Sequence, residues 1–295
     1  MKAAITGVAL AGLAMASAMA QESGTLAKAK ANGSIVMGVR DASVPLSYAI
    51  GSGFVGYHVE LCEGALKKLL PGVAIKAMAV TPSNRLPLLQ NGTIDIECGS
   101  TTNNLARQQS VSFANTTYIT EARFAVRTSS GITSAEDLRG RNVATPTGTT
   151  LVQRLRKLQK DGGVNLSLVT AKDHAESFLL LETGRVDAFA MDDNMLAGVI
   201  SNAKTPSDFR IVGKPLGIEP IAIMLRKDDV AFKKAIDGYI AESYASGALE
   251  KLYAKWFLSS IPPRGAVINI PLSDSLRAAF AAPNDRPAEA YEDAR

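Results

Sequence analysis

Short β-branched runs alternate with amphipathic stretches in the first hundred residues of the chain. Residues 34–39 (SIVMGV) predict a strand, and so do residues 73–80 and 93–97. Between these strands, apolar residues recur at helical spacing after Gly56, and residues 86–90 predict a shorter helix. A β-α-β-α-β order of this kind predicts a parallel sheet with helices packed on its faces.

The same order recurs in the second half of the chain, which predicts a second unit of similar design. The expected elements are strands at 141–145, 166–170, 186–191, 210–213 and 221–225, and helices at 147–160, 173–182, 194–202, 232–246 and 248–257. The tail 283–295 is polar, and we expect it to be disordered. The predicted fold class is α/β, with two units that are each a mostly parallel sheet flanked by helices.

The first twenty residues have a different pattern, which is typical of a secretory signal peptide. Lys2 precedes an apolar run at residues 4–17, and Ala18-Met19-Ala20 forms a cleavage box before Gln21. A transmembrane anchor is the alternative, but the run is short and rich in Ala and Gly rather than Leu. We therefore expect residues 1–20 to be removed and the protein to be periplasmic.

Composition excludes several classes of protein. Apolar residues make up 46% and charged residues 20% of the 295 residues, which argues against a disordered chain. The net charge is only +4, with Lys and Arg scattered among acids, so we expect no nucleic-acid partner. Two His and two Cys are too few for a zinc ribbon, and we expect no metal and no cofactor. Cys62 and Cys98 would form a disulfide in an oxidising compartment, and two buried thiols are the alternative.

Polar side chains gather where the predicted strands end, which is where open α/β sheets bind ligands. Arg40 follows the first strand, and His174 and Asp192 follow strands of the second unit. Each has a more ordinary explanation when taken alone: an exposed charge for Arg40, and helix capping for His174 and Asp192. The residues at these ends are Arg40, Arg85, Ser100, Thr101, Thr102, Arg107, Thr147, Gly148, Thr149, Thr150, His174 and Asp192.

Catalysis on such a scaffold is the main alternative to binding. A periplasmic dehydratase or lyase would need a general acid or base, for which only His174 and Glu97 are attractive. The sequence has no nucleophile elbow, phosphate-binding loop or paired catalytic carboxylates. We therefore predict that the protein is not an enzyme and that it has no catalytic residues.

Several segments resemble one family of transport proteins. They include Arg40–Tyr48 (RDASVPLSY), Asn84–Thr93 (NRLPLLQNGT), Glu97–Asn104 (ECGSTTNN) and Leu225–Asp229 (LRKDD). Over residues 24–285 the chain resembles the periplasmic amino-acid-binding proteins of ABC importers, solute-binding protein family 3, and most of all their glutamate/aspartate-binding branch. Two departures are Pro82, where the branch has Ser so that Ser83 is displaced by one, and His58 in place of an acid.

The resemblance implies a type II periplasmic binding protein fold with two lobes and a two-strand hinge. Residues 21–121 and 219–295 would form the first lobe, and residues 122–218 the second. Arg107 would bind the α-carboxylate of the ligand, and Asp192 its α-ammonium. Arg40, Arg85 and His174 would meet an acidic side chain. The other implied ligand-binding residues are Ser83, Ser100, Thr102, Thr147, Thr149 and Thr150.

The charges of these residues agree with an acidic ligand. Three arginines against one aspartate give +2 before His174 is counted, whereas an acidic amino acid carries −1. We therefore expect a monomeric binding component that captures L-glutamate or L-aspartate and delivers it to an ABC permease. A binding protein for glutamine or asparagine is the nearest alternative.

Overall fold

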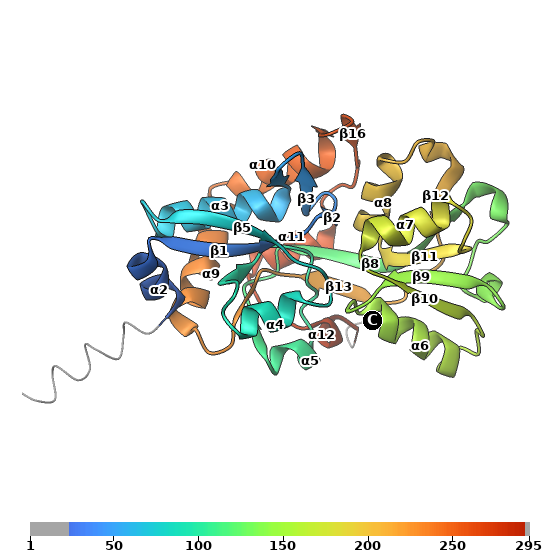
Figure 1. Cartoon of the computed structure of the whole chain (residues 1–295), viewed down its shortest axis with the longest axis horizontal. Coiled ribbons are helices and arrows are strands. Elements are labelled where there is room, and N and C mark those ends of the chain that lie inside the picture. The colour runs from blue at the N-terminus through green and yellow to red at the C-terminus, as the bar shows by residue number, and fades with distance from the viewer. Residues whose placement is uncertain (1–23, 293–295) are drawn as a thin grey trace, which may run out of the picture.

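The computed structural model describes residues 24–292, which form two α/β lobes side by side along the longest axis (Figure 1). The predicted signal peptide lies outside these residues. Within them, no helix is long and apolar enough to cross a membrane.

A five-stranded sheet forms the centre of the first lobe, in the order β5-β1-β6-β14-β7. β5, β1 and β6 are parallel, whereas β14 is antiparallel to both of its neighbours. The alternating apolar residues of the first strand, such as Ile35 and Met37, are fully buried. The strands are β1 (Ser34–Val39), β5 (Ala74–Ala79), β6 (Ile96–Glu97), β7 (Val111–Phe113) and β14 (Met224–Arg226).

Helices cover this sheet, and α3 packs against both α9 and α10. A π-helix, Ala254–Leu258, continues α10 and places Trp256 and Phe257 in the core. The helices of this lobe are α2 (Thr25–Asn32), α3 (Tyr57–Leu69), α4 (Arg85–Gln90), α5 (Leu105–Gln108), α9 (Val230–Ala245), α10 (Ala248–Tyr253), α11 (Asp274–Ala281) and α12 (Ala288–Glu292).

The second lobe has a six-stranded sheet in the order β10-β9-β11-β8-β12, with β13 also paired to β8. β10, β9 and β11 are parallel, and β8 is antiparallel to its three partners. The strands are β8 (Tyr118–Arg127), β9 (Asn142–Pro146), β10 (Ser167–Ala171), β11 (Ala188–Asp192), β12 (Phe209–Val212) and β13 (Ile218–Ile221). The helices are α6 (Leu151–Asp161), α7 (His174–Glu182) and α8 (Asp193–Ser201), with 3₁₀ turns at Thr128–Ser130, Glu136–Leu138 and Pro206–Asp208.

Two paired strands, β8 and β13, connect the lobes. Tyr118 lies opposite Ile221, and Glu121 lies opposite Ile218. Two small sheets complete the fold at the side of the first lobe. Their strands are β2 (Ala42–Ser43), β3 (Ser47–Ile50), β4 (Gly53–Val55), β15 (Ser260–Ile261) and β16 (Ala266–Val267).

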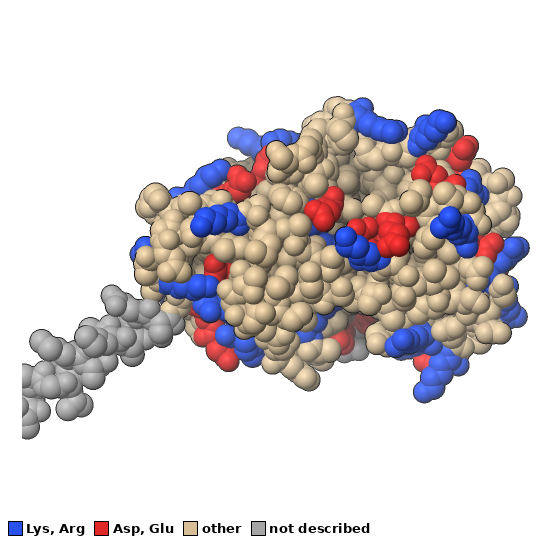
Figure 2. Space-filling view, viewed as in Figure 1, with Lys and Arg blue, Asp and Glu red and all other residues tan. Residues whose placement is uncertain are grey.

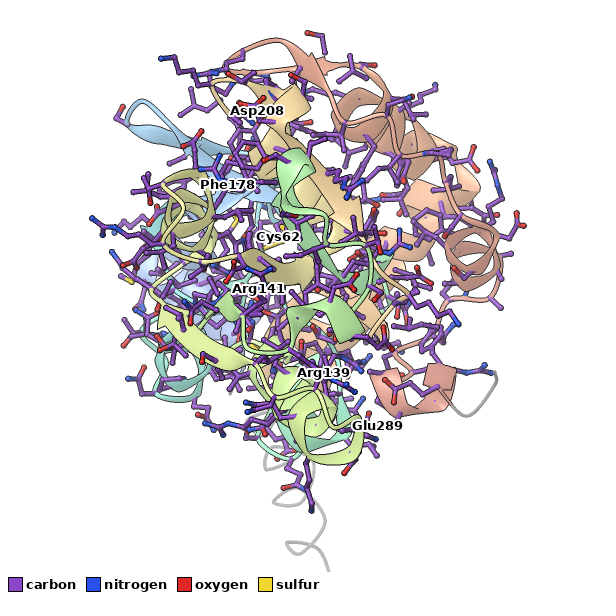
Figure 3. The ribbon with its side chains drawn as sticks, turned by 90° about the vertical axis from the view of Figure 1, so that its right-hand side faces the viewer. Cys62, Arg139, Arg141, Phe178, Asp208 and Glu289 are labelled. Atoms are coloured by element: carbon purple, nitrogen blue, oxygen red, sulfur yellow. A yellow bond between two sulfur atoms is a disulfide. The ribbon has the colours of Figure 1, made fainter. Side chains whose placement is uncertain are left out.

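The described part of the C-terminal tail is ordered, so the prediction of disorder for residues 283–295 was wrong for residues 283–292. Asn103 holds this segment, because its side-chain amide donates to the carbonyl of Asp285 and its own carbonyl accepts the N–H of Ala288. At the far end, Glu292 pairs with Arg154 of α6 at 2.7 Å. The end-on view places Glu289 of α12 and Phe178 of α7 on opposite sides of the molecule (Figure 3).

Cys62 and Cys98 form a disulfide, as predicted. The bridge ties α3 to the residue that follows β6, and both cysteines are buried. It therefore anchors the start of the Gly99–Asn104 loop, which contributes to the candidate site.

Candidate functional site

Arg40 is held at the end of β1 by hydrogen bonds on both its backbone and its side chain. Its N–H donates to Ser47 Oγ at 2.9 Å, and its Nη1 donates to Ser100 Oγ at 3.3 Å. The side chain is fully buried, and its Nε has no hydrogen-bond partner. Burial, together with the positive charge of Arg85, lowers the pKa of Arg40 to about 9. The protein therefore carries a desolvated cation at a strand end.

Arg85, the first residue of α4, is a second buried cation in the same place. Its Nη1 donates to the carbonyl of Ser100 at 3.0 Å and lies 4.0 Å from Glu97 Oε1. Glu97 is itself fully buried and accepts a hydrogen bond from Thr101 Oγ1 at 2.6 Å. Burial lowers the pKa of Arg85, although Glu97 and Asp192 act in the opposite direction. Sequence reasoning had considered Glu97 only as a catalytic group, whereas its role here is to stabilise Arg85.

His174 of α7 reaches across from the second lobe. Its Nδ1 lies 3.1 Å from the carbonyl oxygen of Ala42 and 3.3 Å from Ser43 Oγ. Ser43 Oγ in turn lies 3.1 Å from Ser100 Oγ, so a chain of polar contacts joins His174 to the first lobe. The other ring nitrogen, Nε2, is buried without a partner. Ser43 was not predicted as a site residue, because its role depends on contacts between distant segments.

Asp192, at the end of β11, is a buried carboxylate with no hydrogen bond on either oxygen. Burial and the neighbouring acids Glu219 and Asp193 raise its pKa well above the ordinary value. The alternative explanation, helix capping, does not apply, because its side chain makes no capping bond to α8. Asp193 also has another role, since it accepts the hydroxyl of Thr120 at 2.6 Å. Asp192 is therefore free to pair with a cation.

Arg107 of α5 contacts both lobes. Its Nη1 donates to the carbonyl of Thr102 at 2.8 Å, and its Nη2 donates to the carbonyl of Gly148 at 3.2 Å. Gly148 approaches the first lobe so closely that a Cβ there would lie 2.6 Å from the carbonyl oxygen of Pro82. The two lobes are therefore in contact beside Arg107.

The hydroxyl groups that were predicted to bind ligand differ in their burial and in their hydrogen-bond partners. Thr149 is buried and donates to the carbonyl of Pro146, whereas Thr150 donates to Glu219 Oε2 at 3.0 Å. Thr147 and Ser83 are exposed, and the Ser83 hydroxyl contacts Thr81 Oγ1 at 3.0 Å. The groups that lie together around Ser100 are Arg40, Ser43, Arg85 and, through Ser43, His174.

A groove of about 510 Å³ lies between the lobes next to this cluster. Asp41, Ala42 and Tyr48 line it from the first lobe, and Phe178 and Gly198 line it from the second. The space-filling view shows the molecule hollowed between its lobes near the upper edge, and Lys and Arg are scattered among acids elsewhere on that face (Figure 2).

This arrangement can bind a small molecule that carries both signs of charge. A buried charge without a partner costs free energy, which a ligand of opposite charge recovers on binding. Carboxylates suit Arg40 and Arg85, and an ammonium group suits Asp192. Among residues 24–292, no cluster of His, Cys, Asp or Glu could hold a metal ion. The fold and the site thus define a two-lobed binding protein of the type II periplasmic class.

Residues 35–259 match the model of the bacterial extracellular solute-binding proteins, family 3, and the chain belongs to that family. It is 42% identical over 274 residues to the L-glutamate/L-aspartate-binding protein of Pseudomonas aeruginosa, covering 90% of each chain. It is 43% identical over 291 residues to the glutamate/aspartate import solute-binding protein of Escherichia coli K12, covering 96% of each. These relatives are named as binding proteins and not as enzymes.

The fold is similar to that of a solved amino-acid receptor. The solute receptor for L-cysteine of Neisseria gonorrhoeae has a TM-score of 0.71 and 24% identity, over 79% of this chain and 94% of that chain. The similarity confirms the predicted two-lobe α/β architecture.

Proposed function

We propose that the protein is the binding component of an ABC import system that captures L-glutamate or L-aspartate between its lobes. One observation carries this proposal: the site contains two fully buried guanidinium groups, Arg40 and Arg85, and also Asp192, a buried carboxyl group without a hydrogen-bond partner. The names of the relatives that align over 90% or more of the chain support the same ligand class.

In this proposal Arg107 binds the α-carboxylate, and Asp192 binds the α-ammonium group. Arg40, Arg85 and His174 bind the side-chain carboxylate, which a neutral amino acid lacks. A neutral ligand would leave two buried cations without an anion, so the site rejects it by unpaired charge. The remaining proposed contacts come from Ser83, Ser100, Thr102, Thr147, Thr149 and Thr150.

Ligand capture would proceed by closure of the lobes. We assign residues 21–121 and 219–295 to the first lobe and residues 122–218 to the second, with β8 and β13 as the hinge strands. Residues 21–23 and 293–295 of this assignment lie outside the described part of the chain. A ligand favours the closed form only through contacts that the open form lacks. Contacts that cross between the lobes include Arg107 to Gly148 and Arg264 Nη1 to the carbonyl of Ala203 at 2.8 Å. The closed monomer would then present both lobes to a membrane permease.

A thermal-shift screen against the twenty common amino acids tests the proposal. A ligand that binds only the folded state raises the melting temperature by mass action, so L-glutamate and L-aspartate should give the largest increases. Calorimetric titration of the best ligand should then give one site per chain. An equal or larger shift with glutamine or asparagine would refute the acidic assignment.

A further inference from the structure

The hydrogen bonds of His174 determine which ring nitrogen carries a hydrogen. The carbonyl oxygen of Ala42 lies 3.1 Å from Nδ1, and a carbonyl can only accept a hydrogen bond. Nδ1 must therefore donate. A neutral imidazole has a single N–H, so its Nε2 then carries a lone pair. Because Nε2 is buried without a partner, the neutral ring leaves an unpaired acceptor inside the protein.

The charges around the ring favour the neutral form while the site is empty. Arg40 and Arg85 are the charged groups that influence the ring, and both are cations. Together with burial they lower the pKa of His174 well below its ordinary value. The elements packed against α7 carry charged residues as well, and so does α7 itself. They are Glu121, Arg123, Arg127, Glu176, Glu182, Asp192 and Asp193, and Asp41, Asp173 and Asp187 directly precede β2, α7 and β11.

Three acids of this group have other partners. Asp173 Oδ1 accepts the N–H of Glu176, and Glu176 Oε2 accepts the N–H of Lys172, both at the start of α7. Asp193 accepts the hydroxyl of Thr120. None of these acids is among the charged groups that influence the ring, so an anion beside His174 would come from the ligand.

We propose that His174 binds the side-chain carboxylate of an acidic amino acid as an imidazolium, so that each binding event takes up one proton from solvent. The inference rests on the proposed function. A carboxylate placed against a neutral ring would face the lone pair of Nε2, and two acceptors repel each other. Protonation at Nε2 converts that contact into a charge-assisted hydrogen bond, while Nδ1 keeps its bond to Ala42. The carboxylate also offsets the positive field of Arg40 and Arg85.

A second group in the site, Asp192, can release a proton when the ligand binds, whereas His174 takes one up. The pKa of Asp192 is raised in the ligand-free protein, and an ammonium group beside it would favour the ionised form and release a proton. The total proton count of the wild type therefore combines both residues. The contribution of His174 is isolated by comparing the wild type with a variant in which Asp192 is unchanged.

Nitrogen-15 NMR of the histidine rings tests the inference without any substitution. The chain has only two histidines, His58 and His174, so two sets of ring signals are expected. His58 serves as an internal reference, because its Nδ1 bonds to the carbonyl of Gly99 within the first lobe. At pH 7 the His174 ring should be neutral and protonated at Nδ1, and L-glutamate should protonate both nitrogens. A ring that stays neutral in the complex would overturn the proposal.

Calorimetry in two buffers of different ionisation enthalpy counts the protons taken up on binding. At pH 7 the wild type should take up about one proton more per L-glutamate than His174→Gln, whose amide can bond but cannot titrate. The ratio of the wild-type affinity to that of His174→Gln should also fall about tenfold per unit rise in pH between the free and bound pKa of the ring. Equal proton counts in the two proteins would overturn the inference. Absence of any binding heat from L-glutamate or L-aspartate would instead contradict the proposed function.

Discussion

Gly198 offers a way to separate lobe closure from folding. It lies in α8 of the second lobe, and it is buried against the backbone of Val44 in the first lobe. A Cβ at position 198 would lie 2.4 Å from the carbonyl oxygen of Val44 and 2.9 Å from its carbonyl carbon. Gly198→Ala therefore places a methyl group where the closed form has no space, and Val44 can yield only by moving backbone.

The size of the effect follows from two opposing terms. Overpacking of a close contact costs about 1–3 kcal/mol, and this cost falls on the closed form alone. Alanine in a helix is favoured over glycine by about 0.8–1 kcal/mol, and this gain is present in the open and closed forms alike. Ligand affinity should therefore fall by about 5- to 150-fold, while the ligand-free protein should be as stable as the wild type or more stable.

Gly238→Ala is the matched control. Gly238 also lies inside a helix, α9, but a Cβ there would meet no atom within 4 Å. Calorimetry with L-glutamate gives the affinities, and denaturant unfolding without ligand gives the stabilities. The control should gain stability and bind normally. If Gly198→Ala bound L-glutamate as tightly as the control, or lost stability without losing affinity, the assigned role of this contact in closure would be wrong.

The remaining predictions concern the site and the disulfide. Arg107→Ala should abolish binding of every amino acid, whereas Arg85→Ala should weaken the binding of acidic amino acids most. Equal losses of affinity across ligand classes in calorimetry would contradict these assignments. The raised pKa of Asp192 means that its ionisation destabilises the ligand-free fold as the pH rises through that pKa. Asp192→Asn should therefore raise the ligand-free melting temperature at pH 7 and remove the shift caused by L-glutamate, and an unchanged shift would refute its role. Reduction of the Cys62–Cys98 bridge, whose cysteines are 36 residues apart, should lower the free energy of unfolding by about 4 kcal/mol in denaturant titrations, and no change would count against the loop-entropy argument.

The sequence predicted the parallel β/α units well because their strands are buried runs and their helices have one apolar face. The sequence pattern did not predict β8, because its segment YITEARFAVR contains three charged residues. In the structure β8 is an interior strand that pairs with β11 on one side and β12 on the other. The sequence pattern joined β13 and β14 into one strand at 221–225, although the chain passes there from one sheet to the other. The long helix expected from residue 147 begins at Leu151, because residues 147–150 form a turn around Gly148, whose φ is +82°.

The site was predictable to the extent that its residues follow strands. Arg40 and Asp192 lie at strand ends, Arg85 and His174 were expected beside them, and the resemblance added a role for each. The supporting contacts were not predictable, because Ser43 and the Ala42 carbonyl act through the relative position of segments more than a hundred residues apart. The polar tail shows the same limit, since its order depends on Asn103.

The position of β14 has a consequence for how the chain can be assembled. This strand, Met224–Arg226, lies between β6 and β7, which precede it by more than a hundred residues. All strands of the second sheet have emerged by Ile221, whereas the first sheet still lacks the strand between β6 and β7. A nascent chain emerging from its amino end can therefore complete its second domain before its first. Until residue 226 appears, β6 and β7 lack the strand that joins them, and the first sheet is incomplete.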